Sequence, residues 1–293
     1  MATKDNTTTP TAAALLTKVD TLRKKAAKRS PVELNAPLPD GRPIPKQLPI
    51  WPESVRGVPN SILRSALFGA IKRGKRSFMT REPVASVDGV TVLQTGPRLD
   101  QADLDVWEQC THLARTGGLG TRIQFSAYGF LKSIERGTGK SQHEWLKDAF
   151  ARLASTVVEI KDGKRAYFGP MIHHGTRDDE TGCYVIEINP AIAALYDKDG
   201  WTGEEWAQRL ALRKMPLAQW LHGFYSTHRH PYPYKVETLH RLCGSEAAQL
   251  FHFRAELREA LERLAAVTGW ACEVDGDDLV RIEKPKKAIK GTA

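Results

Sequence analysis

Apolar residues recur every three or four positions along two stretches of the chain, residues 141–155 and 246–268. This spacing predicts an amphipathic helix that buries one face and leaves the other to solvent. The expected buried stripes are Leu146, Ala149, Phe150 and Leu153 in the first helix, and Leu250, Phe253, Leu257, Leu261 and Leu264 in the second.

The surroundings of these two helices follow one plan. A shorter helical pattern and a glycine turn precede each helix, with residues 126–135 before Gly137-Thr138-Gly139, and residues 236–243 before Gly244-Ser245. A predicted β-hairpin with a charged turn follows each helix, at Asp162-Gly163-Lys164 and at Asp275-Gly276-Asp277. A helix-turn-helix followed by a hairpin is the winged-helix plan. The sequence therefore predicts an α+β fold with two tandem winged-helix units.

Further patterns fill in each half of the chain. A helix is predicted over residues 99–116, a strand over residues 184–188 and a helix after Asn189-Pro190. Two more helices are expected over residues 204–212 and 216–228, and a small hairpin is expected around Asp88-Gly89. Each half then has a leading helix, a helix-turn-helix and a wing.

Composition divides the chain into four parts. Residues 1–46 are rich in Thr, Ala, Pro and Lys, with five prolines between residues 31 and 45, and predict a flexible, basic N-terminal arm. The first winged-helix domain is predicted over residues 47–200 and the second over residues 201–285, because glycines near residue 200 separate the two patterns. Residues 286–293 are predicted to be a basic C-terminal tail.

The charge balance narrows the class of partner. The 293 residues carry a formal net charge of +9 and a sequence pI near 9.4, which favours a polyanion and a salt-sensitive complex. The four cysteines form no CxxC pair and lack zinc-site spacing to histidines, so reduced thiols and no metal are expected. No apolar run approaches the roughly 18 residues of a membrane span, and the polar N-terminus is unlike a signal peptide. We therefore expect a cytoplasmic protein without a membrane partner.

Double-stranded DNA is the partner that two winged-helix units predict, and the exposed faces of the long helices supply candidate contacts. In the first unit the candidates are Lys140, Ser141, His143 and Lys147 on the helix, and Lys161, Lys164 and Arg165 on the hairpin. In the second unit they are Ser245, His252, Arg254 and Arg258. Because the second hairpin is acidic, contact of this unit with DNA and contact with another protein both stay open.

Two motifs suggest other chemistry but are interpreted as structural. Gly139-Lys140-Ser141 lacks the first glycine of a Walker A loop, whose position is Ile134. His173 and His174 are adjacent on a predicted strand, so their side chains are expected on opposite faces and a shared metal site is not expected. No catalytic residues and no cofactor are predicted, and the chain is interpreted as a non-enzymatic protein.

Several blocks of the chain have a distinctive sequence. The two main blocks are STHRHPYP at residues 226–233 and ETLHRLCGS at residues 237–245. The segment over residues 51–60, RSALF at residues 64–68 and DDLV at residues 277–280 are further blocks. With these blocks the chain resembles the TrfA family of plasmid replication initiators, from about residue 47 to residue 284.

The resemblance implies an initiator that binds directly repeated origin sites, called iterons, as a monomer. It also implies opening of an adjacent AT-rich segment, recruitment of the host replicative helicase, and a monomer–dimer equilibrium in which dimers restrain copy number. The family docks on the DNA polymerase sliding clamp through a Gln-Leu-x-Leu-Phe-like peptide. The matching clamp-binding residues here are Gln47, Leu48, Ile50 and Trp51, although Trp51 is also a candidate anchor of the first domain.

Two other functions stay open from the sequence. A transcriptional repressor with the same folds would bind a palindromic operator as a stable dimer, because operator symmetry mirrors protein symmetry. A metal-dependent nickase would use His228 and His230 with Tyr232, but Arg229 lies between the histidines and prolines follow them, which favours a helix-ending corner. The symmetry of the bound site tests the repressor, and strand cleavage of supercoiled DNA tests the nickase.

Overall fold

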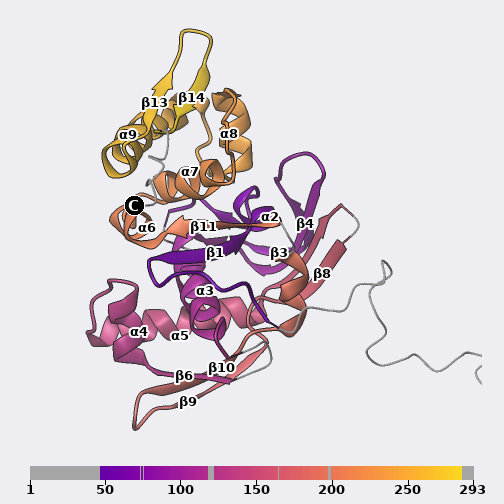
Figure 1. Ribbon diagram of the computed structural model, residues 1–293, viewed down its shortest axis with the longest axis vertical. Helices are drawn as coiled ribbons and strands as arrows, with labels where there is room; N and C mark the ends of the chain where they lie inside the picture. Colours follow the sequence, from indigo (N-terminus) through magenta and orange to yellow (C-terminus); the bar gives the residue numbers. More distant parts are fainter. Residues whose placement is uncertain are drawn as a thin grey trace, which may run out of the picture. The chain divides into compact units, whose positions relative to one another are not determined.

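The computed structural model describes residues 47–72, 74, 76–117, 122–163, 165–196 and 199–285. The predicted N-terminal arm, residues 1–46, and the predicted C-terminal tail, residues 286–293, lie outside the described residues. Figure 1 shows the described elements in sequence colours, from β1 in indigo to β14 in yellow.

Short strands and helices alternate along the first part of the chain. The strands are β1 (Val55–Pro59), β2 (Phe68–Gly69), β3 (Phe78–Val84), β4 (Val90–Pro97), β5 (Leu99–Asp100), β6 (Arg122–Ser126), β7 (Val157–Asp162), β8 (Arg165–Pro170), β9 (His174–Asp178), β10 (Cys183–Glu187) and β11 (Trp201–Glu205). The helices are α2 (Asn60–Leu63), α3 (Gln101–Ala114), α4 (Ala127–Ser133), α5 (Lys140–Ser155), the 3₁₀ helix η1 (Pro190–Leu195) and α6 (Trp206–Ala211).

The second part of the chain is shorter. Its elements are α7 (Pro216–Ser226), β12 (Tyr234–Lys235), α8 (Val236–Leu242), α9 (Leu250–Thr268), β13 (Ala271–Val274) and β14 (Leu279–Glu283). The helices predicted over residues 99–116, 141–155, 216–228 and 236–243 are confirmed with small differences at their ends. The helix predicted from residue 246 begins at Leu250, and the one predicted from residue 204 begins at Trp206 because residues 201–205 form strand β11.

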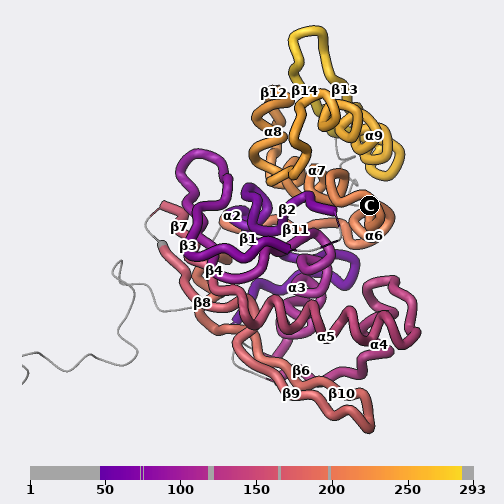
Figure 2. The backbone as a smooth tube through the Cα atoms, turned by 180° about the vertical axis from the view of Figure 1, so that it is seen from behind, coloured from indigo at the N-terminus to yellow at the C-terminus, as the bar shows by residue number. Residues whose placement is uncertain are grey.

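The two three-stranded sheets have the same topology. The strand order is β6-β10-β9 in the first sheet and β12-β14-β13 in the second. Each sheet takes one strand before a helix pair, α4–α5 or α8–α9, and two strands after it, with the last strand in the middle. The leading helices α3 and α7 pack against α5 and α9. Figures 1 and 2 both show β6, β9 and β10 side by side next to α4 and α5.

The hairpin around Asp162-Gly163-Lys164 belongs to another sheet. Strands β7 and β8 pair with each other, but β7 also pairs with β4, which gives a four-stranded sheet in the order β3-β4-β7-β8. The strand that pairs with β6 is β10. The prediction that β7–β8 is the wing of the first helix pair is therefore wrong, because β9–β10 occupies the place that β13–β14 has in the second unit. Two hairpins follow α5 in succession, and only strand pairing distinguishes them.

The hydrophobic core consists of two clusters that divide at the end of α6. The first cluster ends along the chain at Leu210 and the second begins at Leu212. Strand β11 pairs antiparallel with β1, so residues 201–205 belong with the first cluster. The clusters therefore divide about ten residues beyond the predicted boundary at residue 200.

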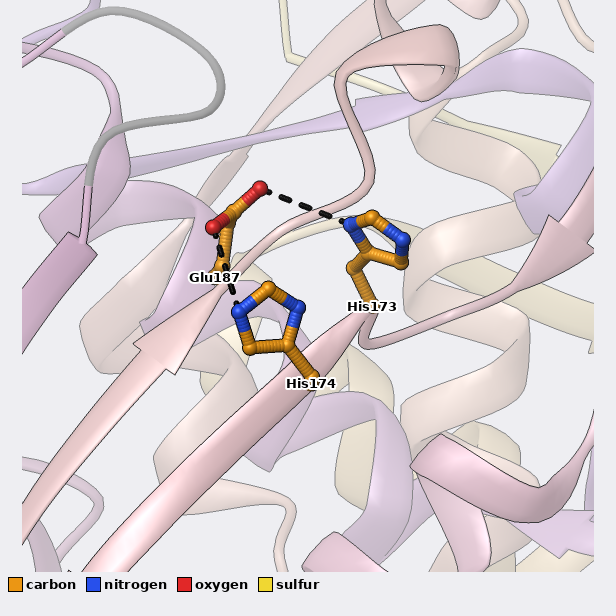
Figure 3. Close-up of side chains that lie close together, drawn as sticks. All are labelled: His173, His174 and Glu187. Carbon is orange, nitrogen blue, oxygen red and sulfur yellow. Dashed lines mark hydrogen bonds and ion pairs between the residues drawn. The ribbon is translucent and has the colours of Figure 1, made fainter.

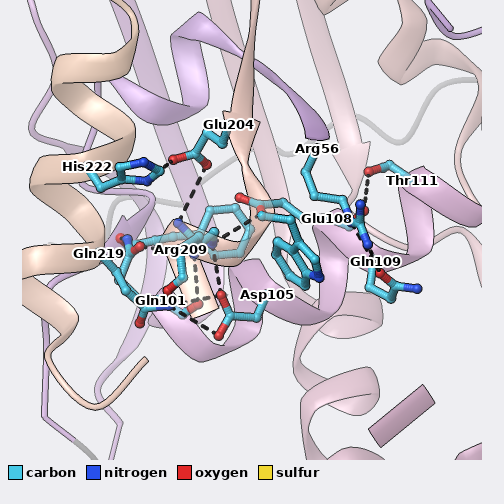
Figure 4. Close-up of polar contacts among 12 residues, drawn as sticks. Arg56, Gln101, Asp105, Glu108, Gln109, Thr111, Glu204, Arg209, Gln219 and His222 are labelled. Atoms are coloured by element: carbon cyan, nitrogen blue, oxygen red, sulfur yellow. Dashed lines mark hydrogen bonds and ion pairs between the residues drawn. The ribbon is translucent and has the colours of Figure 1, made fainter. Parts of the chain in front are cut away.

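Helix α3 buries charged residues on the side where α6 packs. Asp105 and Glu108 lie around the guanidinium of Arg209, and all three residues are at most 1% exposed. The Arg209 Nε atom lies 2.9 Å from Asp105 Oδ1 and 3.1 Å from Glu108 Oε2 (Figure 4). The sequence pattern predicted a helix over residues 99–116 but gave no sign that these carboxylates are buried.

Strand β11 and helix α7 complete this buried network. Glu204 Oε2 of β11 lies 3.6 Å from Arg209 Nη1, and Glu204 Oε1 lies 3.1 Å from His222 Nδ1 of α7. Gln219 Nε2 of α7 donates a hydrogen bond to Asp105 Oδ1 at 3.1 Å. Because α7 belongs to the second cluster and α3 to the first, these polar contacts join the two clusters (Figure 4).

The carboxyl groups of the network differ in their affinity for a proton. Burial raises the pKa of Glu108 well above its ordinary value of 4.5, since the charged form is poorly solvated. Burial acts in the same direction on Glu204, but Arg209 and His222 outweigh it and lower the pKa of Glu204. Glu108 therefore holds a proton more readily than Glu204 does.

Two further features of the fold are the state of its cysteines and the hydropathy of its helices. The four cysteines are free thiols, and Cys110 and Cys243 are buried. Burial raises the pKa of the Cys243 thiol to about 12, so this group is a poor nucleophile. Within the described ranges, no helix is both long enough and apolar enough to cross a bilayer.

Arg209→Met measures how much the buried network stabilises the fold. The variant leaves buried carboxylates without their cation, so we expect the free energy of unfolding to fall by about 3–5 kcal/mol. Urea unfolding followed by tryptophan fluorescence gives this value. The control Arg281→Met removes a more exposed pair, Arg281 Nε to Asp275 Oδ2 at 2.8 Å, and should cost about 0–1 kcal/mol. Equally small losses in both variants would contradict the assigned role of Arg209.

Candidate nucleic-acid interface

Helix α5 presents a polar face that contains four of the predicted DNA contacts. Its buried residues are the predicted stripe, Leu146, Ala149, Phe150 and Leu153. Lys140 and Ser141 are exposed in the first turn, and His143 is half-buried. No side chain caps the helix at Gly139, and the positive end of the helix dipole favours an anion at this position.

Lys147 connects α5 to the tip of the β9–β10 hairpin. Its Nζ atom lies 2.9 Å from Glu144 Oε1 and 3.7 Å from Asp179 Oδ1. Asp179 also accepts a hydrogen bond from Arg177 Nε at 2.8 Å. The hydrogen bond to Glu144 raises the pKa of Lys147. Before Lys147 can contact a base, its side chain must therefore give up its contacts with the carboxylates of Glu144 and Asp179.

The other basic candidates of the first unit lie on the β7–β8 hairpin. Lys161 is exposed in β7, Arg165 begins β8, and Lys164 lies outside the described residues. Asp162 is paired with Val90, so the turn of this hairpin lies beside the start of β4. Figures 1 and 2 both show this sheet on the side of α5 away from α4, whereas the first turn of α5 adjoins α4. The structure does not bring the β7–β8 turn together with Lys140 and Ser141.

Helix α9 exposes a mixed face. Phe251 is 58% exposed, and its ring centroid lies 3.8 Å from that of exposed His252. Arg258 is exposed about two turns beyond Phe251, so both project from one side of the helix. Ser245 is half-buried in the preceding turn, where its Oγ accepts a hydrogen bond from the Ala247 amide at 3.2 Å.

Arg254 attaches the β13–β14 hairpin to α9. Its Nε and Nη2 atoms donate to Asp278 Oδ1 and Oδ2 at 2.9 and 2.8 Å. Asp278 lies in the turn of the hairpin with a φ of 62°, and the hydrogen bonds from Arg254 lower its pKa. The sequence predicted Arg254 as a DNA contact, but in this conformation its planar fork already holds a carboxylate.

His228 and His230 lie in the corner that follows α7. His228 Nδ1 lies 2.9 Å from the carbonyl oxygen of Phe224, and its Nε2 lies 3.4 Å from the Tyr234 hydroxyl. Burial lowers the pKa of His228, and His230 is exposed. Among the described residues, neither histidine belongs to a group of three side chains that could share a metal ion. These contacts agree with the predicted helix-ending corner.

His173 and His174 instead converge on one carboxylate. His173 Nδ1 lies 3.4 Å from Glu187 Oε1, and His174 Nε2 lies 3.3 Å from Glu187 Oε2 (Figure 3). The prediction that the two rings point to opposite faces is wrong. Strand alternation does not apply to His173, because β9 begins only at His174.

A family model settles the relationship of this chain to known proteins. The model described as TrfA protein matches residues 45–284. The chain belongs to the TrfA family. The match covers every helix and strand given above, and it confirms the family resemblance predicted over residues 47–284.

A curated relative and two solved structures are similar to this TrfA family member. The plasmid replication initiator protein TrfA of Escherichia coli is 28% identical over 224 residues, which cover 73% of this chain and 58% of the relative. Crystal structures of domains 2 and 3 of RctB match with TM-scores of 0.51 and 0.52 at 11% and 10% identity. They cover 75% and 77% of this chain, and 94% and 98% of the RctB chains. At this identity the likeness concerns the fold.

Two of the blocks that carry the family resemblance pack against each other. Arg64 of the RSALF block donates from Nε to Thr227 Oγ1 at 2.8 Å and from Nη2 to the Thr227 carbonyl at 2.9 Å. Thr227 belongs to the STHRHPYP block that ends α7. The ETLHRLCGS block forms α8 and the following turn. The RSALF and STHRHPYP blocks therefore fasten the first part of the chain to the end of α7, the leading helix of the second part.

The peptide that resembles a clamp ligand is partly inside the fold. Gln47 and Ile50 are exposed, but Leu48 and Trp51 are each only 3% exposed. Trp51 stacks on Tyr196 and donates from Nε1 to His112 Nδ1 at 3.0 Å. Trp51 therefore anchors the first cluster. Clamp docking through this peptide stays a prediction, and it requires Leu48 and Trp51 to leave their core positions.

Trp51→Ala and Ile50→Ala separate the two roles of this peptide. Trp51→Ala removes a buried aromatic ring, so the free energy of unfolding should fall by about 3–5 kcal/mol. Ile50 is 73% exposed, and Ile50→Ala should change it by less than about 0.5 kcal/mol. Thermal and urea unfolding of both variants measure this difference. A Trp51→Ala protein as stable as the parent would show that the peptide is not part of the core and would favour the clamp role.

Proposed function

We propose that this chain initiates plasmid replication by binding repeated origin sites with two winged-helix units. The observation that carries the proposal is the repeated topology, in which a helix pair and a hairpin share a sheet of order β6-β10-β9 or β12-β14-β13. Membership of the TrfA family and the net charge of +9 support a DNA partner. In such units the second helix of the pair enters the major groove, so α5 and α9 are the recognition helices.

In this proposal the wings are the β9–β10 and β13–β14 hairpins. Their tips are acidic, with Asp178, Asp179 and Glu180 in the first and Asp275, Asp277 and Asp278 in the second. Carboxylates repel phosphates, so the recognition helices and other basic segments supply the backbone contacts. The acidic tips instead hold Lys147 and Arg254 of the recognition helices in place.

The first recognition helix meets DNA with its N-terminal turn. Lys140, Ser141 and the positive end of the α5 dipole face a phosphate, which sets the register of the helix. Lys147, two turns further along, exchanges Asp179 for a base edge or a phosphate when the groove closes around it. A phosphate accepts the same kind of charge-assisted hydrogen bond as the carboxylate that it replaces.

The second recognition helix combines an aromatic contact with a cation. Exposed Phe251 is suited to the C5-methyl group of thymine, and Arg258 on the same side of α9 is suited to guanine O6 and N7. His252 and Ser245 border this face. The second unit thus reads mainly base edges, whereas the first unit carries more of the phosphate contact.

Occupancy of several adjacent repeats would provide the free energy that opens a neighbouring AT-rich segment. Each bound unit deforms the duplex, and flexible steps lower the cost of that deformation. Recruitment of a replicative helicase and of the sliding clamp, and a balance between monomers and dimers, complete the proposed function. The aligned region covers 58% of the Escherichia coli relative. We therefore propose the helicase, clamp and dimer contacts for this chain and do not transfer them from that relative.

A footprint on the origin of the protein's own replicon tests the proposed role. We expect protection of evenly spaced direct repeats across a protein titration, with permanganate reactivity in an adjacent AT-rich stretch. A single symmetric protected site without opening would contradict the initiator role and would indicate a repressor, because a palindrome reflects a dimer. The same reactions run on supercoiled plasmid with magnesium or manganese test for nicking.

Lys140→Ala and Lys161→Ala test which element meets the backbone. Lys140 lies in the first turn of α5, so its loss should lower the slope of log K against log salt concentration by about one. Lys161 lies on the β7–β8 hairpin, outside the proposed winged-helix unit, and its loss should leave the slope unchanged. Binding titrations by fluorescence anisotropy at several salt concentrations give both slopes. A lower slope for Lys161→Ala together with an unchanged slope for Lys140→Ala would contradict this assignment and would indicate that the β7–β8 hairpin is the wing.

A further inference from the structure

The base of the β9–β10 hairpin carries two imidazoles and a carboxylate within reach of one ion. His173 lies just before β9, His174 begins β9, and Glu187 ends β10 opposite His174. One ligand atom from each residue can be chosen so that all three lie within 4.8 Å of one another. We propose that these three side chains bind a divalent transition-metal ion, with zinc as the best match.

The distances suit this assignment. Zinc bonds of about 2.0–2.1 Å in a tetrahedral site place neighbouring ligand atoms roughly 3.3–3.4 Å apart. His173 Nδ1 lies 3.4 Å from Glu187 Oε1 and His174 Nε2 lies 3.3 Å from Glu187 Oε2, so each imidazole lies at this spacing from one oxygen of the carboxylate. Figure 3 shows both rings directed at Glu187 from the same side of the hairpin. Because the three ligand atoms lie within 4.8 Å of one another, binding of the ion would draw the two exposed rings closer together.

The donor set determines the class of ion. Two imidazole nitrogens and one carboxylate oxygen favour zinc, nickel or copper over magnesium or calcium, which prefer oxygen ligands. Three protein ligands leave a coordination position for water. The histidine side chains are 50% and 52% exposed, so the ion can enter from solvent without opening the core.

Other contacts of the hairpin indicate what the ion does. The His173 amide donates to the Glu187 carbonyl at 3.0 Å, so the ligands sit on a backbone that is already paired. Every residue of β9 is exposed, and β9 pairs only with β10 within its sheet. A bound ion would fasten this edge strand at its base, while the contact between Lys147 and Asp179 holds the tip. The ion would therefore stabilise the hairpin against opening.

The neighbouring residue Arg122 provides a way to test whether the cleft binds a cation. It faces Glu187 across the β6–β10 pair and lines the same small cleft, of about 70 Å³, as His174. Its positive charge opposes a cation in that cleft. Arg122→Ala should therefore tighten metal binding, whereas a mere surface cluster of histidines hydrogen-bonded to Glu187 predicts no such gain.

Cobalt(II) titration of the full chain, prepared without a histidine tag, tests the site. We expect one visible d–d absorption signal, which disappears when zinc displaces cobalt. In His174→Ala and Glu187→Gln, each of which loses a ligand, the affinity for cobalt should fall by about 100-fold or more. The control His230→Ala changes an exposed histidine outside the cluster and should leave the signal unchanged. Equal cobalt binding by all variants would overturn the proposal.

Hydrogen exchange provides a second readout that does not depend on the absorption signal. Zinc should slow exchange of the β9 amides in the parent chain and leave them unchanged in His174→Ala, because an ion that binds the folded hairpin stabilises it by mass action. Unfolding midpoints without metal confirm that each variant folds. Unchanged β9 exchange in the parent at saturating zinc would contradict the fastening role. Neither readout involves DNA, so failure here leaves the proposed initiator function untouched.

Discussion

The buried guanidinium of Arg209 constrains the whole described fold. A full charge inside a protein is tolerated only where opposite charges and hydrogen bonds replace water. Here α3 and β11 supply the carboxylates around the guanidinium, and Gln219 of α7 donates a hydrogen bond to one of them, Asp105. The same residues lie where one hydrophobic cluster gives way to the other. Movement of α7 relative to α3 would leave carboxylates such as Asp105 and Glu204 without partners. The first and second parts of the chain are therefore tied by electrostatics as much as by apolar packing.

The topological repeat explains how one chain contains two similar units of different size. Strand, helix pair and hairpin recur in both parts, but in the first part the β7–β8 hairpin is inserted between α5 and β9. This insertion pairs with the β3–β4 hairpin and extends a separate sheet. The insertion carries the basic residues Lys161, Lys164 and Arg165, whereas the hairpins in the wing position carry acidic tips.

Both wing-position hairpins are attached to their helix by the same kind of contact. Asp179 approaches Lys147 of α5, and Asp278 holds Arg254 of α9 in a two-bond pair. In each case a carboxylate of the hairpin turn neutralises a cation of the long helix. A phosphate accepts the same charge-assisted hydrogen bonds as these carboxylates, so under the proposed function DNA and the hairpin turns compete for Lys147 and Arg254.

Local sequence patterns were sufficient to predict most of the helices and turns. Apolar residues spaced at three and four positions mark α3, α5, α7 and α9, because burial of one helical face requires that spacing. The glycine turns and the charged hairpin turns could also be predicted from the sequence. Blocks such as STHRHPYP were sufficient to predict the family. Each of these signals lies within a short stretch of chain.

Features that depend on contacts between distant residues became visible only in the folded chain. Asp105 and Glu108 look like ordinary polar positions of a helix until Arg209, about a hundred residues later, packs on them. Which hairpin shares a sheet with β6, and whether Trp51 lies inside or outside, are set by long-range pairing and packing. His173 and His174 meet at Glu187 because β9 begins between them, a difference of one residue. Local periodicity cannot contain such information, since contacts between distant residues leave no regular spacing in the sequence.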